Sequence, residues 1–129
     1  MRTIKSVLFL VLNLFAFTCF AEKTPTISQQ ALLTLMATPT AEALILDVRS
    51  PEEFAQGHIK GAVNISHDQI KQNLSKIIDY KDKTVVVHCR SGFRAIRAEN
   101  ALRSAGFSKL QHLEGDMNAW QDANLPLEK

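Results

Sequence analysis

The stretch that most constrains the fold runs from Val85 to Arg94. Three consecutive valines lead through His88 to Cys89, and the short sequence Arg90-Ser91-Gly92-Phe93-Arg94 follows directly. An alanine-rich pattern with helical spacing then extends from Ala95 to Ala105. This order predicts a buried strand, a tight loop and a helix, with a thiol at the first position of the loop.

A loop of this kind concentrates positive potential around the thiol. Backbone N–H groups in a tight loop and at the start of a helix converge on one spot and favour negative charge there. Arg90 and Arg94 add side-chain charge. Cysteine most often packs as a small buried hydrophobic residue. Because small and basic residues flank Cys89, we expect instead a reactive, partly exposed thiol in an anion-binding cradle.

Strand and helix patterns alternate along the rest of the chain. Apolar runs predict further strands at residues 44–48, 62–65 and 109–113, and residues 22–26 are expected to be a polar entry segment that leads to a helix opening at Ile27-Ser28. Helical patterns begin near residues 28, 50, 66 and 116. Such alternation favours an α/β fold with a parallel sheet covered on both faces. Ligands in these folds bind beyond the carboxyl ends of the strands, where Cys89 lies.

Local signals mark the helix ends. Ser28 is a predicted N-cap, and Ser50-Pro51-Glu52-Glu53 combines a capping box with proline at the first helical position. Ser66 to Gln69 is a second predicted capping box, and it should start a helix whose apolar stripe is Ile70, Leu74, Ile77 and Ile78. Asn124 is expected to end the last helix in a left-handed conformation.

The first 21 residues read as a secretory signal peptide. Arg2 and Lys5 precede the apolar run from Val7 to Phe17, and cleavage is expected after Ala21. An uncleaved membrane anchor is the alternative, but the run is shorter than the ~20 residues that a spanning helix needs. We therefore expect one domain over residues 22–129, exported to the periplasm, or secreted where the source has no outer membrane, with no stable membrane association after cleavage.

Cleavage changes both the charge and the cysteine count. The whole chain has 15 basic and 13 acidic residues, and the signal peptide takes away two basic ones, so the mature net charge is zero. Nucleic-acid binding therefore has no electrostatic support. Cys19 leaves with the signal peptide, so Cys89 remains alone in an oxidising compartment. A single thiol cannot form an internal disulfide.

Three segments together resemble the single-domain form of the rhodanese (sulfurtransferase) family. They are Leu46–Arg49 with Glu53-Phe54 and Gly57–Ala62, then Cys89–Arg94, and finally Gly115–Met117 with Trp120 and Leu125-Pro126. The likeness extends over residues 27–127. The sequence departs from the family pattern at Asp116 and Asn124, where glycine is common, and at Phe93, where many relatives have a small or polar residue.

The resemblance implies a mainly parallel five-stranded sheet with helices on both faces. It also implies a thiosulfate sulfurtransferase without metal or organic cofactor. Cys89 would take sulfane sulfur from a small anionic donor and pass it from a persulfide to cyanide or a thiol, a thioredoxin-like protein being one candidate acceptor. Cys89 would be catalytic, and the donor would be bound by the rest of the loop: Arg90, Ser91, Gly92, Phe93 and Arg94.

Other polar residues have more ordinary expected roles. Asp47 and Arg49 should brace the loop after their strand, and His58 should make a structural hydrogen bond. His88 precedes Cys89 in a strand, so their side chains should point to opposite faces. We expect His67 and His112 at the surface or in a cap, and Trp120 to be a packing residue with its N–H satisfied. None of the histidines has metal-ligand spacing with a second ligand.

Three other functions remain open. A persulfide carrier for a protein partner would use the same Cys89 chemistry. A non-catalytic binding module would share the fold alone. A cysteine phosphatase of related fold needs an arginine after five intervening residues, and Ala95 stands at that position. The shorter loop therefore favours a sulfur donor over phosphate.

Overall fold

The computed structural model describes residues 23–129, so the predicted signal peptide lies outside the described residues. One sheet is formed by β1 (Thr26–Ile27), β2 (Ala43–Asp47), β3 (Val63–Asn64), β4 (Thr84–His88) and β5 (Leu110–Leu113). The spatial order is β1-β5-β4-β2-β3, and every neighbouring pair is parallel. The predicted α/β fold with a five-stranded parallel sheet is confirmed.

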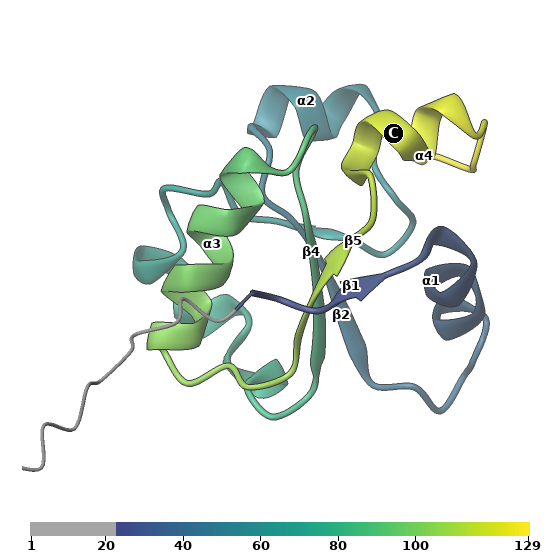
Figure 1. Cartoon of the computed structure of the whole chain (residues 1–129). Coiled ribbons are helices and arrows are strands. Elements are labelled where there is room, and N and C mark those ends of the chain that lie inside the picture. Colours follow the sequence, from purple (N-terminus) through teal and green to yellow (C-terminus); the bar gives the residue numbers. More distant parts are fainter. Residues whose placement is uncertain (1–22) are drawn as a thin grey trace, which may run out of the picture.

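Helices cover both faces of this sheet. They are α1 (Gln29–Met36), α2 (Pro51–Gln56), α3 (Phe93–Ser104) and α4 (Asp116–Asp122), with short 3₁₀ helices η1 (Lys71–Lys76) and η2 (Ile78–Tyr80). Figure 1 shows α3 on one side of the sheet and α1 on the other, with α2, α4 and the start of α3 at one end. Within the described range, none of the helices has the length and apolarity needed to cross a bilayer.

The core consists of two apolar layers, one on each face of the sheet. Successive side chains of β4 point into opposite layers. Val85 and Val87 pack with the layer under α3, and Val86 packs with the layer that holds Leu32 and Trp120. The α3 layer contains Ala95, Ala98 and Leu102, all fully buried. Small side chains let α3 lie close to the sheet, so the loop that joins β4 to α3 is held firmly at both ends.

The predicted helix ends at residues 28, 50 and 124 are confirmed. The Ser28 side chain accepts a hydrogen bond from the Ala31 amide at 3.0 Å. Ser50 and Glu53 form both halves of the capping box at the start of α2. Asn124 has φ +53°, a left-handed conformation that asparagine tolerates. These short-range signals depend on few neighbours, which is why the sequence alone reveals them.

Two predictions of secondary structure are wrong. Thr26 and Ile27 form β1 and pair with His112 and Leu113, although the sequence predicts a polar entry segment up to Thr26 and a helix that opens at Ile27-Ser28. The helix predicted from Ser66 is replaced by a turn and the two 3₁₀ helices. The Ser66 hydroxyl donates to the Arg49 carbonyl at 3.4 Å, so a tertiary hydrogen bond competes with the predicted cap.

The apolar stripe of that segment is also only partly correct. Ile70 and Ile77 are buried in the layer under α3, whereas Ile78 is 48% exposed. Asn73 has non-helical backbone angles, and its side-chain amide donates back to the Gln69 carbonyl at 2.7 Å. A regular α-helix is therefore interrupted near residue 73.

Candidate active site

Cys89 is the first residue after β4, at the carboxyl end of the central strand. Its sulfur accepts a hydrogen bond from the Gly92 amide at 3.0 Å. Gly92 has φ +115°, a conformation that folds the loop back over the sulfur. Cys89 is only 1% exposed and packs in the apolar layer under α3, so the expectation of a partly exposed thiol is wrong.

Unpaired amides at the start of α3 directly follow the Gly92 amide in the chain. The N–H groups of Phe93, Arg94 and Ala95 occupy the first turn of the helix, where no intrahelical acceptor is available. Among residues 23–129, none of the three donates to another backbone or side-chain acceptor. Together with the Gly92 amide, they form a ready site for negative charge. Arg90 and Ser91 are exposed, and Phe93 is 80% exposed.

The opposite side of the loop is clamped by the start of α4. The amides of Met117 and Asn118 donate to the carbonyls of Cys89 and Arg90, each at 3.1 Å. The Asp116 carboxylate accepts the Cys89 amide at 2.9 Å. The backbone of the nucleophile is therefore held on both its N–H and its C=O side.

Arg94 is part of a bidentate ion pair with Glu53 of α2. Its two terminal nitrogens lie 2.6 and 3.0 Å from the two carboxylate oxygens. The hydrogen bond from Arg94 lowers the pKa of Glu53 to about 2. The Glu53 carboxylate raises the pKa of Arg94, and the Cys89 sulfur acts in the same direction. Arg94 is thus a positioned cation beside the sulfur, whereas Arg90 makes no side-chain hydrogen bond or ion pair within residues 23–129.

Comparison with known proteins identifies the domain. The Rhodanese-like domain family matches residues 28–123. The chain belongs to the rhodanese-like family. Thiosulfate sulfurtransferase 16, chloroplastic, from Arabidopsis thaliana is 36% identical over 91 residues, which cover 63% of this chain and 76% of that protein. The chain is a rhodanese-like domain with sulfurtransferase relatives.

A further sequence relative and a solved structure are also similar to this chain. The uncharacterized protein YibN of Escherichia coli K12 is 36% identical over 87 residues, 67% of this chain and 61% of YibN, so the match spans less than two thirds of that relative. The crystal structure of thiosulfate sulfurtransferase from Pseudomonas aeruginosa superposes with a TM-score of 0.71 at 26% identity. That match covers 83% of this chain and 20% of the Pseudomonas chain.

Asp47 and Arg49 of the rhodanese-like domain form a buried ion pair next to the loop. The Arg49 guanidinium contacts both carboxylate oxygens, the shortest distance being 2.7 Å, and also donates to the Gly57 carbonyl at 2.8 Å. His58 follows the Gly57 cap of α2, and its Nδ1 is 2.9 Å from the Phe54 carbonyl while its ring stacks on Phe54. These contacts connect β2 to α2 and hold the segment that carries Glu53.

His88 lies on the opposite face from Cys89. The ring Nδ1 is 3.0 Å from the Cys89 carbonyl, and because a carbonyl only accepts, Nδ1 carries the proton. Burial lowers the pKa of His88, so the ring is neutral at pH 7. Its Nε2 is 3.7 Å from an Asp47 oxygen and has no hydrogen-bond partner. His88 therefore orients the Cys89 carbonyl from the opposite face of the sheet. Its ring does not contact the Cys89 sulfur.

The prediction that His112 is a surface or capping residue is wrong. Its Nδ1 lies 2.8 Å from Glu99, and its Nε2 lies 2.9 Å from Asp116. The Asp116 carboxylate, followed by Glu99, raises the pKa of His112 to about 10. One signal in the sequence could have indicated this cluster: Glu99 falls on the same helix face as Ala95, Ala98 and Leu102, and a buried acid requires a partner.

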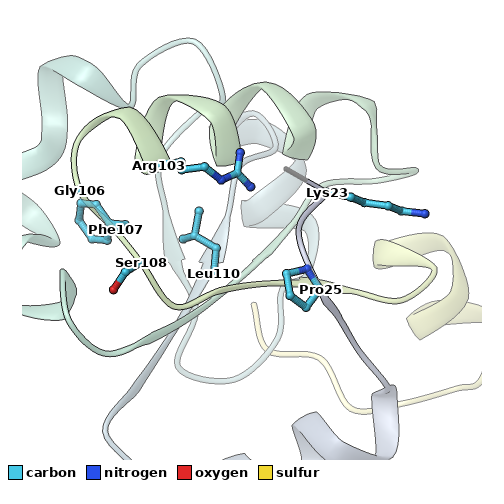
Figure 2. Close-up of a pocket in the computed structure, with 7 residues that line it drawn as sticks. All are labelled: Lys23, Pro25, Arg103, Gly106, Phe107, Ser108 and Leu110. Carbon is cyan, nitrogen blue, oxygen red and sulfur yellow. The ribbon is translucent and has the colours of Figure 1, made fainter. Parts of the chain in front are cut away.

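Two cavities adjoin α3. A cavity of about 260 Å³ lies beside the loop, between Gly92, Phe93, Ile96 and His112. A larger one of about 630 Å³ lies by the far end of the helix, where Figure 2 shows Arg103 and Lys23 near Pro25, Phe107 and Leu110. Among residues 23–129, the lining of the larger cavity includes no cysteine, histidine or acidic side chain. In residues 23–129, no group of three or more His, Cys, Asp or Glu side chains is arranged to hold a metal ion.

Proposed function

We propose that this domain is a sulfurtransferase that uses thiosulfate or a similar anionic donor. The Cys89 thiolate attacks the outer sulfur of the donor, the S–S bond breaks, and sulfite leaves with the bonding electron pair. The Cys89 persulfide then gives its outer sulfur to cyanide or a thiol, and the thiolate is restored. The observation that carries this proposal is the Gly92 amide directed at the Cys89 sulfur at 3.0 Å, beside the unpaired amides of α3.

The electrostatics of the loop suit an anionic intermediate. Donors that are already in place when negative charge develops need no rearrangement during the reaction. The outer sulfur of a persulfide lies one bond beyond the Cys89 sulfur, where the first amides of α3 are available to stabilise it. Arg90 supplies an exposed cation for the oxygens of the donor, and Arg94 supplies a second one held by Glu53.

Loop length favours sulfur over phosphate. The helix begins at Phe93, and Arg94 is its second residue. A phosphate-binding cysteine loop needs one more residue before its arginine, and Ala95, fully buried, occupies that position. The smaller cradle suits a single transferred sulfur atom.

A second candidate is a persulfide carrier for a protein partner. Phe93 is 80% exposed and Ile96 is 55% exposed, and both lie beside the cavity next to the loop. Exposed apolar side chains next to a nucleophile favour a macromolecular acceptor. A thioredoxin-like protein in the periplasm would fit the predicted export of the chain.

Intact mass and a thiocyanate assay test these functions together. We expect the reduced protein to gain one sulfur atom on Cys89 after incubation with thiosulfate, and to form thiocyanate when cyanide is added. Cys89→Ser should show neither while keeping the fold. Sulfur gain without thiocyanate would identify a carrier. A free Cys89 thiol that gains no sulfur from any sulfane-sulfur donor would contradict the proposal and favour a binding module.

A further inference from the structure

A cluster of three charged side chains joins β5, α3 and α4 behind the nucleophile. His112 of β5 bridges Glu99 of α3 and Asp116 of α4 at 2.8 and 2.9 Å. The second oxygen of Asp116 accepts the Cys89 amide at 2.9 Å. Glu99 and Asp116 are each only 3% exposed. A continuous chain of hydrogen bonds therefore extends from α3 through His112 to the backbone of Cys89.

Asp116 occupies this position at a conformational cost. Its φ is +54°, in the left-handed region that most side chains avoid. A non-glycine residue in that region persists only where its surroundings hold it in place, and such positions concentrate at functional sites. At Asp116, the surroundings are the two hydrogen bonds of its carboxylate, one to His112 and one to Cys89.

The charged groups of the cluster also contribute to the electrostatic potential near the loop, together with Arg90 and Arg94. A carboxylate next to the Cys89 amide would repel an anionic donor if it stood alone. Protonated His112 lies directly against that carboxylate, and its raised pKa keeps it charged at neutral pH. The adjoining cavity is lined by Gly92, His112 and Asp116, so the cluster is close to the path of small molecules near the loop.

We propose that Asp116 is a positioning residue that fixes the Cys89 backbone in the cradle, and that His112, held by Glu99, both orients the Asp116 carboxylate and neutralises it toward the donor. This proposal rests on the proposed sulfurtransferase function. It separates two effects: the hydrogen bond of Asp116 acts on the rate of sulfur transfer, and the charge of His112 acts on donor binding.

Three variants separate these effects. Asp116→Gly removes the carboxylate and relieves the backbone, and kcat with thiosulfate and cyanide should fall about tenfold, as expected for one lost hydrogen bond to a charged group. Asp116→Asn keeps an oxygen for the Cys89 amide and should retain most of kcat. His112→Gln keeps a donor for Asp116 without the charge, and should raise KM for thiosulfate several-fold while kcat changes little.

Asp122→Asn is the matched control, because it removes an exposed carboxylate from the same helix. It should leave kcat and KM unchanged. Unfolding by urea shows whether each variant is folded, and rates are compared per folded molecule. The proposal would be overturned if Asp116→Gly had the same kcat as Asp122→Asn, or if His112→Gln had an unchanged KM. Either result would leave the cluster a purely structural role.

Alkylation keeps the two proposals distinguishable. The rate at which iodoacetamide modifies Cys89, followed by peptide mass mapping, reports the reactivity of the thiolate and does not require sulfur transfer. It should fall about tenfold in Asp116→Gly, because the Cys89 backbone is no longer fixed and the sulfur loses its alignment with the Gly92 amide, and it should match the wild type in Asp122→Asn. A wild-type protein that forms no persulfide refutes the sulfurtransferase function. An unchanged alkylation rate in Asp116→Gly refutes the positioning role.

Discussion

Replacing Gly92 with alanine tests whether its amide supports the sulfur. Gly92 has φ +115°, so any side chain there is strained by about 1–3 kcal/mol. A Cβ atom would lie 3.2 Å from an Asp116 oxygen and 3.7 Å from His112 Nε2, so the carboxylate has to move by a few tenths of an ångström. We expect the free energy of unfolding to fall by about 1–3 kcal/mol through strain, with the loop distorted at the same time.

Gly92→Ala should also lower the rate of sulfur transfer, by an amount that can be estimated from the lost hydrogen bond. Misaligning the 3.0 Å hydrogen bond from Gly92 to the Cys89 sulfur removes a bond to a charged acceptor, which is worth about 1.5–3 kcal/mol. At about 1.4 kcal/mol per factor of ten, kcat/KM for thiosulfate should fall by roughly 10- to 150-fold. Initial rates of thiocyanate formation measure this loss directly.

Gly61→Ala is the matched control for backbone strain. Gly61 has φ +78°, and a Cβ there would meet no atom within 4 Å. It should lose comparable stability in urea unfolding and keep the kcat/KM of the wild type. If Gly92→Ala loses stability as Gly61→Ala does but keeps full activity, the Gly92 amide does not support the reacting sulfur.

Three further results follow from charges near the loop. Arg94→Ala should raise KM for thiosulfate more than it lowers kcat, because it removes positive charge and leaves Cys89 in place; equal loss at every thiosulfate concentration would contradict this. Glu53→Gln should raise KM for thiosulfate less than Arg94→Ala does, since glutamine retains a hydrogen bond to Arg94 and the cap of α2. A KM equal to that of Arg94→Ala would argue against a retained contact. Because the pKa of His112 is raised from 6.5 to about 10, its ion pairs contribute stability that is complete below pH 6.5 and is lost as the pH rises to about 10. Urea unfolding across this range should show a steeper decline in the wild type than in His112→Gln, and identical slopes would exclude the effect.

The central part of the fold could be predicted because its signals are local. Val85–Val87 is apolar at every position, as a strand buried on both faces must be, and the loop after it contains the residues that a tight anion site needs. Ser28 and Ser50 were identified as caps because capping involves only the next three residues. The packing role of Trp120 is also confirmed: the ring is fully buried, and its N–H donates to the Pro126 carbonyl at 3.0 Å.

The errors arise where distant segments decide the structure. β1 has only two residues, and its strand conformation depends on pairing with His112 and Leu113, more than 80 positions later. Ser66 looks like a cap in sequence, but its hydroxyl serves Arg49 in the fold. His112 looks like an isolated polar residue because its partners, Glu99 and Asp116, come from other elements.

The burial of Cys89 shows a different limit of prediction from the sequence. The residues around it correctly predict a polar, amide-rich loop, yet Cys89 is only 1% exposed and belongs to the apolar layer that contains Ala95 and Ala98. Strand alternation directs its side chain to the same face as Val85 and Val87, and that face is covered by α3. The composition of the loop therefore predicts the polar groups near the sulfur. The alternating direction of the β4 side chains predicts that the Cys89 side chain is buried.

The clamp that α4 places on the loop has a consequence for the order of assembly. Ribosomes make the amino-terminal part first, so β4, Cys89 and α3 leave the ribosome before Asp116, Met117 and Asn118 exist. Until those three residues dock, the amide and carbonyl of Cys89 lack the partners that the finished domain provides. The site therefore forms only once α4 has docked, and a chain cut before Asp116 would carry the nucleophile and both arginines without the backbone contacts that fix the loop.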